Sequence, residues 1–249
     1  MISFSIVVPV YSGEAYLTDL MSEIDKVKTG LETDGSNLQL AEVIFVEDGA
    51  IDGSSALIDD LAGQYPYVAA LHLSRNFGQH PATVAGILHS SGDWVVTMDE
   101  DLQHPPARIA DLFDVVAETG ADIVYGKPRD GTHQSAMRDL SSRLYKRLIE
   151  TLTGNHNITK VNSFRLVRGP VARAASGICG HDTYFDVALG WFSQRVESIE
   201  MDLRDLRYID SGKSGYSFRS LLSHARRLAF SSHINRHSPS GLPSDVKIA

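Results

Sequence analysis

Two aspartates spaced two positions apart carry the strongest chemical signal in this sequence of 249 residues. Asp99 and Asp101 follow the apolar run Trp94–Met98, and Gln103 comes two positions later. In an extended segment, side chains alternate, so the two carboxylates should point the same way while Glu100 faces away. Carboxylate and amide oxygens suit hard divalent cations. The segment therefore predicts an Mg²⁺ or Mn²⁺ site with partly exposed ligands, although a solvated acidic turn would show the same spacing.

Two further polar clusters follow apolar runs earlier in the chain. Pro9, Tyr11 and Glu14 lie at and beyond the end of the first run, and Asp48 follows the second. In open parallel α/β sheets, ligands bind at the carboxyl ends of the strands. We therefore expect these clusters to form one pocket with the Asp99 segment. Simple strand termination, or a turn ahead of Gly49, would also place Tyr11 and Asp48 there.

The elements that must position these residues alternate between strand and helix patterns. Such alternation predicts a mostly parallel, Rossmann-like α/β sheet flanked by helices, with a less regular C-terminal part. The predicted strands are Phe4–Val10, Val43–Val46, Val68–Leu73, Trp94–Met98, Asp122–Tyr125, Ser163–Val167 and Val196–Leu203. The predicted helices are Tyr16–Thr29, Ser54–Gln64 with Ser54 as N-cap, Pro81–Ser91, Pro106–Thr119, Ser135–Thr153, Thr183–Ser193 and Phe218–Ser232.

The composition limits the partners and the cellular location that we expect for this protein. The formal net charge of −8 argues against nucleic-acid binding. The single cysteine, Cys179, cannot form an internal disulfide, so a cytoplasmic location is expected. No run of about 18 apolar residues is present, so we expect no membrane-spanning helix. The apolar start Met1–Val10 lacks the basic lead-in of a signal peptide.

The charge is unevenly distributed. Between Arg204 and Arg236, seven residues are basic and two are acidic, which suggests an anionic partner at that end of the chain. The predicted helix at 218–232 has an apolar stripe that could lie peripherally on the inner face of a membrane. Docking of this stripe on the rest of the protein is an equally good interpretation.

Four ordered motifs resemble those of the family-2 glycosyltransferases, especially the branch that makes polyprenyl-phosphate sugars and includes the dolichol-phosphate mannose synthases. The family patterns are V-P-x-Y-N-E, D-D-G-S-x-D-G-T, R-N-F-G and D-A-D-L-Q-x-P-P-E. Here they read VPVYSGE (8–14), EDGAIDGS (47–54), RNFG (75–78) and DEDLQHPP (99–106). Ser12 and Gly13 replace the family's Asn-Glu, and Glu47 and Ala50 depart from the second pattern, which leaves the donor nucleotide open.

The resemblance implies a GT-A fold and an inverting transfer of a sugar from a nucleotide donor. It implies a catalytic domain over residues 1–203, with a nucleotide-sugar-binding half (1–127) and an acceptor-side half (128–203). A basic segment (204–236) and a flexible tail (237–249) would follow. Residue by residue, Pro9, Tyr11, Glu14, Asp48, Asp99 and Glu100 would contact the donor, and Asp99, Asp101 and Gln103 would hold the metal.

Basic residues are needed near the diphosphate or an acceptor phosphate, since one divalent ion cannot balance both. Arg129, Arg207 and Lys213 are candidates for the donor side. Arg165, in an apolar strand, and Asp101 are candidates for the catalytic step. Asp182 and Asp186 are candidate bases, although a helix cap or a surface charge would explain each of them equally well.

The acceptor is expected to be polyprenyl phosphate, because an ionised phosphate attacks the anomeric carbon without a general base. Transfer to a hydroxyl of a saccharide or natural product is the alternative. A sugar-phosphate nucleotidyltransferase and a non-catalytic nucleotide-sugar binding protein are alternatives of other classes. The sequence leaves open a homodimer, the sugar and the choice of metal.

Overall fold

The computed structural model describes residues 1–129, 160–180 and 183–203, and in them one seven-stranded sheet. Its order is β3-β2-β1-β4-β6-β5-β7. Strands β1 to β4 run parallel, β6 runs antiparallel to both β4 and β5, and β7 is parallel to β5. The strands are β1 (Ile2–Val10), β2 (Leu38–Glu47), β3 (Val68–His72), β4 (Trp94–Thr97), β5 (Ile123–Pro128), β6 (Arg165–Arg168) and β7 (Val196–Met201).

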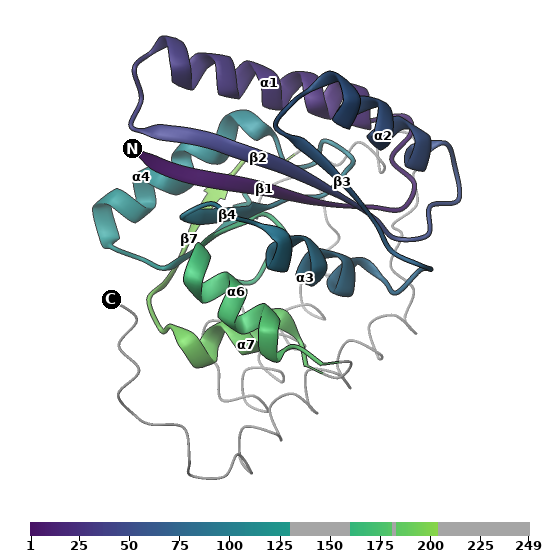
Figure 1. Cartoon of the computed structure of the whole chain (residues 1–249). Helices are drawn as coiled ribbons and strands as arrows, with labels where there is room; N and C mark the ends of the chain where they lie inside the picture. The colour runs from purple at the N-terminus through teal and green to yellow at the C-terminus, as the bar shows by residue number, and fades with distance from the viewer. Residues whose placement is uncertain (130–159, 181–182, 204–249) are drawn as a thin grey trace, which may run out of the picture.

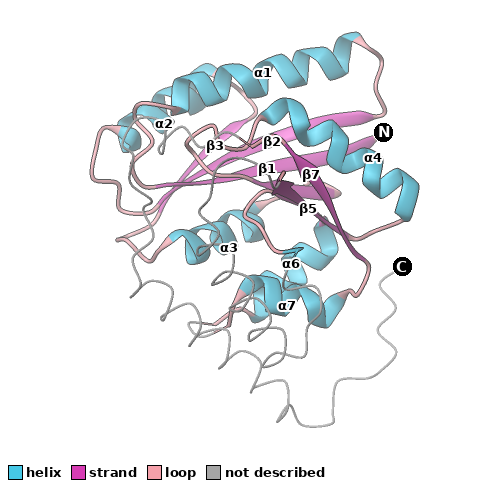
Figure 2. Ribbon diagram, turned by 180° about the vertical axis from the view of Figure 1, so that it is seen from behind, coloured by secondary structure: helices cyan, strands magenta, loops and turns pink. Residues whose placement is uncertain are grey.

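Helices cover both faces of this sheet (Figures 1 and 2). One layer holds α1 (Leu17–Thr33), α2 (Ser54–Gln64) and α4 (Ile109–Thr119), which the short turn η1 (Pro106–Arg108) precedes. The other layer holds α3 (Gln79–His89), α6 (Gly169–Ile178) and α7 (Phe185–Phe192). The fold is thus a three-layer α/β sandwich.

The alternation of side chains along β1 explains this arrangement. Ile6, Val8 and Val10 pack into the core beneath α1, α2 and α4, while Val7 packs into the core beneath α3, α6 and α7. From Phe4 to Val10 every residue is buried. A strand covered on both faces is expected to be a nearly continuous apolar run, and here only Ser5 interrupts it, with its hydroxyl bonded to Glu42.

The predicted fold class is confirmed, and most elements lie where the sequence placed them. The prediction that Ser54 caps α2 was wrong, because Ser54 is the first helical residue and Gly53 is the N-cap. The amide of Ser54 instead donates to Oδ1 of Asp52 at 3.0 Å. Helix α6 was not predicted, and neither was the insertion of β6 between β4 and β5.

Strands from both predicted halves share this sheet, since β6 and β7 pair with β4 and β5. The predicted helices Ser135–Thr153 and Phe218–Ser232 and the tail lie outside the described residues. None of the helices in the described ranges is long and apolar enough to cross a membrane.

Candidate active site

The loops that follow β1, β2 and β4 are joined by hydrogen bonds at the carboxyl edge of the sheet. The amide of Asp48 donates to the carbonyl of Val10 at 2.8 Å, and the amide of Ile51 donates to the carbonyl of Tyr11 at 3.2 Å. The carboxylate of Glu100 accepts hydrogen bonds from the amide of Tyr11 and its successor. The three predicted clusters therefore form one continuous edge.

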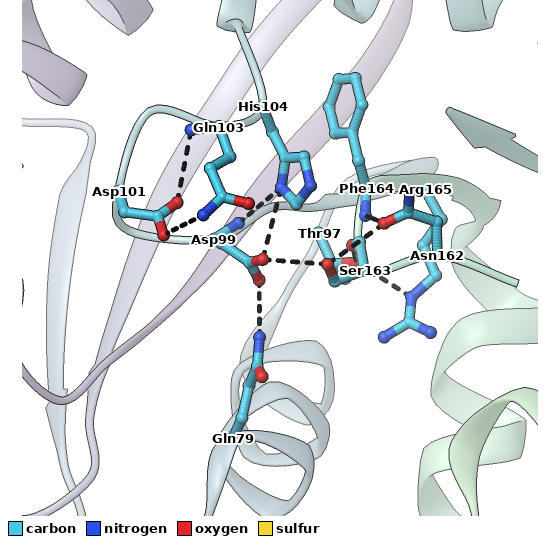
Figure 3. Close-up of polar contacts among 10 residues, drawn as sticks. All are labelled: Gln79, Thr97, Asp99, Asp101, Gln103, His104, Asn162, Ser163, Phe164 and Arg165. Atoms are coloured by element: carbon cyan, nitrogen blue, oxygen red, sulfur yellow. Dashed lines mark hydrogen bonds and ion pairs between the residues drawn. The ribbon is translucent and has the colours of Figure 1, made fainter. Parts of the chain in front are cut away.

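Asp99 lies at the centre of the close-up in Figure 3, where side chains from two other elements hold its carboxylate. Nε2 of Gln79, the first residue of α3, donates to Oδ1 at 2.6 Å. Oγ of Ser163, just before β6, donates to Oδ2 at 3.0 Å. The Asp99 side chain is 25% exposed, so it is oriented by its neighbours yet open to solvent.

His104 forms a hydrogen bond with the backbone of Asp99. Its Nδ1 accepts a hydrogen bond of 3.0 Å from the amide of Asp99, so the neutral ring carries its proton on Nε2. The ring stacks on Phe164, with centroids 5.2 Å apart and planes inclined by 9°. Burial lowers the pKa of His104, because a charged imidazolium would lose its hydration there. The ring is therefore neutral at neutral pH and acts as an acceptor beside the acidic turn.

The side chain of Asp101 is held by Gln103, which was predicted to be a ligand of the same metal ion. Nε2 of Gln103 donates to Oδ2 of Asp101 at 2.8 Å, and the amide of Gln103 donates to Oδ1 at 3.3 Å. The expectation that Asp101 is partly exposed was wrong, since it is only 3% exposed. The segment is also a turn rather than extended chain, and Leu102 has a φ of 59°. Such strained backbone in a non-glycine residue persists where surrounding packing imposes it.

The chemistry of this turn fits a hard divalent cation. Asp99 and Asp101 supply carboxylate oxygens and Gln103 supplies an amide group, and a carboxylate oxygen has more than one lone pair with which to accept hydrogen bonds or bind an ion. Among the described residues, however, no three His, Cys, Asp or Glu side chains form a group that could hold a metal. An ion at this turn would therefore need ligands in addition to the carboxylates and imidazoles of the described residues. The role of Gln103 as a ligand stays a prediction.

Asp48 is buried and holds the neighbouring loop. Its two carboxylate oxygens accept hydrogen bonds of 2.7 Å from the amides of Phe77 and Gly78. Gly49, with a φ of 66°, lies so close to this loop that a Cβ atom there would be 2.6 Å from the amide nitrogen of Asn76. Asp48 therefore shapes the loop in this structure, and its predicted contact with the donor stays a prediction.

Two aromatic side chains beside Asp48 are open to solvent. Tyr11 is 40% exposed and Phe77 is 44% exposed. The guanidinium carbon of Arg75 lies 4.8 Å from the centre of the Phe77 ring. Planar groups of this kind can stack on a nucleobase. Tyr11 was predicted from the sequence as a donor contact, whereas Phe77 was known only as one residue of the R-N-F-G motif.

The remaining donor-side candidates have structural partners. Pro9 is buried within β1. Glu14 is exposed, and its Oε2 accepts a hydrogen bond of 2.9 Å from the amide of Gly53. Arg129 follows β5 on the surface and lies 3.6 Å from Asp202. Their contacts with a donor stay predictions.

Arg165 lies in the core. Its Nε donates to Oγ1 of Thr97 at 3.0 Å, its Nη1 forms an ion pair with Asp186, and its guanidinium lies over the Phe185 ring at 4.8 Å. In Figure 3 a dashed line joins the guanidinium to Thr97, and none joins it to the carboxylate of Asp99 or Asp101. The hydroxyl of Tyr125 also donates to Asp186, at 2.8 Å. In this structure Arg165 thus connects β4, through Thr97, to α7, through Asp186. Its part in catalysis stays a prediction.

Three residues that hold the acidic turn were not predicted from the sequence. Gln79 directly follows the R-N-F-G motif, Ser163 precedes Phe164, and His104 lies within the DEDLQHPP segment. Each was visible as a polar residue within or beside a motif, but only the structure shows that they meet at Asp99. Asp182, Arg207 and Lys213 lie outside the described residues.

Comparison with protein families identifies the chain's relatives. The family described as glycosyl transferase family 2 matches residues 5–173, which is more than half of the chain. The chain is 32% identical over 220 residues to undecaprenyl-phosphate 4-deoxy-4-formamido-L-arabinose transferase of Proteus mirabilis (strain HI4320), and 30% identical to the protein of that name from Klebsiella pneumoniae (strain 342). These matches cover 88% of this chain and 64% of each relative, so the chain spans less than two thirds of their length.

Solved structures with the same fold are more distant in sequence. Glucosyl-3-phosphoglycerate synthase from Mycobacterium tuberculosis, in complex with Mn²⁺, uridine-diphosphate-glucose and phosphoglyceric acid, aligns with a TM-score of 0.61 at 16% identity. That alignment covers 94% of this chain and 79% of that one. TarS 1-349 of S. aureus, in complex with UDP-GlcNAc, aligns with a TM-score of 0.56 at 17% identity, covering 94% and 67%. At these low sequence identities, the structural similarity shows that this chain shares the fold of the two proteins, and nothing about its activity.

Proposed function

Since the chain belongs to glycosyl transferase family 2, we propose that it transfers a sugar from a nucleoside-diphosphate donor to polyprenyl phosphate. The observation that carries this proposal is the acidic turn at the carboxyl edge of the sheet. There the oriented carboxylate of Asp99 is open to solvent, and the exposed rings of Tyr11 and Phe77 lie on loops of the same edge.

The donor would lie along this edge, with its base beside the exposed rings and its diphosphate beside the acidic turn. Tyr11 offers a face for stacking, and Asp48 fixes the loop that carries Phe77. Hydrogen bonds through Glu100 connect the loop after β1 to the turn. These contacts support one binding site that spans both groups of the donor.

A divalent cation, Mg²⁺ or Mn²⁺, would be held by Asp99 and Asp101. When bound, such an ion supplies positive charge that stabilises a departing nucleoside diphosphate. Gln79 and Ser163 would keep the carboxylate of Asp99 in one orientation, so that little reorganisation is needed on binding. The solved Mycobacterium tuberculosis synthase, which shares the fold, holds Mn²⁺ together with its nucleotide sugar.

The acceptor is proposed from the chemistry of the attack and from the relatives' names. An ionised phosphate needs no base, whereas a hydroxyl does. Asp186, a candidate base by sequence, is buried and paired with Arg165, which leaves it poorly suited to accept a proton from an acceptor. The similar proteins from Proteus mirabilis and Klebsiella pneumoniae carry undecaprenyl phosphate in their names. A cytoplasmic location with peripheral membrane contact through 218–232 would bring such a lipid within reach.

The test is an assay of the full chain with UDP-, GDP- and dTDP-sugars, Mn²⁺ and a polyprenyl phosphate in detergent micelles. We expect one donor to give nucleoside diphosphate and a lipid-linked sugar in equal amounts, and Asp99→Asn to reduce both. Gly63→Ala, on the exposed side of α2 with nothing within 4 Å of its Cβ, is the matched control. Release of pyrophosphate would indicate a nucleotidyltransferase, product only with hydroxyl acceptors would exclude the lipid, and binding without turnover would indicate a binding protein.

A further inference from the structure

The side chain of Glu100 lies in the space that a side chain at position 13 would fill. A Cβ atom at Gly13 would lie 2.7 Å from Oε2 of Glu100 and 3.2 Å from its Cδ. Both residues are buried, and Glu100 is only 6% exposed. A larger residue at position 13 would therefore displace the carboxylate, so the two positions depend on each other.

In this space the Glu100 carboxylate binds the backbone of the loop after β1. Oε2 accepts a hydrogen bond of 2.9 Å from the amide of Tyr11, and Oε1 accepts one of 3.2 Å from the amide of Ser12. Hydrogen bonds from a backbone amide to a carboxylate are strong, because the acceptor is charged. The next two amides of the loop also donate to side chains near the start of α2. The amide of Gly13 donates to Oγ of Ser54 at 2.9 Å, and the amide of Glu14 donates to Oδ2 of Asp52 at 3.2 Å. Four consecutive amides thus depend on side chains of other loops.

The same two positions are ones at which this chain departs from the family patterns. The pattern Y-N-E has an acid where this chain has Gly13, and the pattern D-A-D has alanine where this chain has Glu100. In this chain the acid comes from the turn after β4 and the small residue from the loop after β1. Acids at both positions would bring two carboxylates into one buried space, where like charges repel strongly.

We propose that Glu100 is a positioning residue, which holds the loop that carries Tyr11 in a fixed place relative to the turn that carries Asp99 and Asp101. Glycine is required at position 13, because a side chain there would fill the space that the Glu100 carboxylate occupies. A shift of the loop would then move the nucleoside side of the donor site relative to its metal side. Only the kinetic test of this inference rests on the proposed function, because the stability test needs no substrate.

A double-mutant cycle on stability tests the pairing without any substrate. We expect Gly13→Ala to lower the unfolding midpoint of the wild-type protein by about 3 °C, and to leave the midpoint of Glu100→Ala unchanged or higher. The new Cβ would also lie 3.1 Å from Cγ of Leu17, but it would do so in both backgrounds, so the difference isolates Glu100. Gly63→Ala, whose Cβ meets nothing within 4 Å, should change the midpoint equally in both backgrounds, because alanine favours helix α2 over glycine in each of them. Equal effects of Gly13→Ala in both backgrounds would overturn the pairing.

The Michaelis constant for the donor tests the positioning role. We expect Glu100→Ala to raise this KM about tenfold with kcat within about twofold, because a contact that aligns the bound nucleoside contributes equally to ground and transition states. Glu100→Gln keeps the volume and one acceptor oxygen, so its KM should lie in between. An unchanged donor KM in Glu100→Ala would show that Glu100 supports the fold alone, and would overturn the proposal. A wild-type protein without any turnover would instead contradict the proposed function, while the stability cycle would still test the pairing.

Discussion

Oγ of Ser163 donates a hydrogen bond of 3.0 Å to Oδ2 of Asp99, although 64 positions separate the two residues in the chain. The contact exists because β6 runs antiparallel beside β4, with Arg165 opposite Thr97 in the register. Ser163 precedes β6 and Asp99 follows β4, so the two side chains meet at one end of the pair. The orientation of Asp99 thus depends on an element from the second half of the chain.

We expect Ser163→Ala and Gln79→Ala each to weaken the metal-dependent binding of a nucleoside diphosphate by about tenfold. A hydrogen bond to a charged group contributes roughly 1.5–3 kcal/mol, of which part would be replaced by water at this open site. Ser163→Thr keeps the hydroxyl and is the matched control. The measurement is calorimetric titration with Mn²⁺, and unchanged affinity in both alanine variants would show that neither residue positions Asp99.

Asp101 should tolerate asparagine better than alanine. Because Asp101 is 3% exposed and bonded to Gln103, Asp101→Ala should cost about 1–3 kcal/mol of stability by leaving the Gln103 amide without its acceptor. Asp101→Asn keeps the volume and an acceptor oxygen, so it should fold like the wild type yet lose metal-dependent binding.

Chemical denaturation and calorimetric titration together separate these two effects. Full metal dependence in a folded Asp101→Asn variant would remove Asp101 from the metal site. Normal stability of Asp101→Ala would contradict the importance of its contact with Gln103.

The sheet and the three polar clusters could be predicted because they depend on local patterns. The apolar run before Tyr11 and the run before Asp99 each fix a strand and the point where it ends. The position of Ser163 could not be predicted, because it depends on β6 entering the sheet antiparallel between β4 and β5. No local pattern specifies which strands become neighbours across such a distance.

Burial was predicted less well than position. A carboxylate after a strand was expected to be partly exposed, but Asp101 is enclosed by the turn that Leu102 forms at a φ of 59°. Arg165 was a candidate for the catalytic step, since an arginine in an apolar strand is unusual. The structure gives it a buried partner, Asp186, from a helix 21 positions away, and that pairing has no local signature.

Arg165→Met should destabilise the fold strongly. It leaves the carboxylate of Asp186 buried without its counter-ion, which costs about 3–5 kcal/mol. The double variant Arg165→Met/Asp186→Asn removes both charges but keeps an acceptor for the hydroxyl of Tyr125, so it should recover most of this loss in urea denaturation. We expect activity to return together with stability. A folded double variant without activity would show that Arg165 contributes directly to the reaction.

His72 should make stability depend on pH. Partial burial opposes its protonation, but hydrogen bonds to Asp59 and Glu47 prevail and raise the pKa of His72 above its usual value. A raised folded pKa means that the contribution is fully present below the unfolded pKa of about 6.5 and is lost as pH rises through the folded pKa.

The free energy of unfolding of the wild type should therefore exceed that of His72→Gln most at about pH 6. The difference should shrink in alkaline solution. Because the side chain is 37% exposed, about 0.5 M salt should also reduce it. A difference that does not vary with pH would contradict the charged pairing of His72.

The binding of a nucleoside diphosphate with and without Mn²⁺ tests the central claim most directly. In calorimetric titrations of the full chain, we expect the wild type to bind at least about tenfold more tightly with Mn²⁺ than with a chelator, a difference of about 1.4 kcal/mol. We expect Asp99→Asn to lose this enhancement while it keeps its unfolding midpoint in metal-free buffer. Equal affinity of the wild type with and without the metal would contradict a metal-dependent donor site at Asp99 and Asp101.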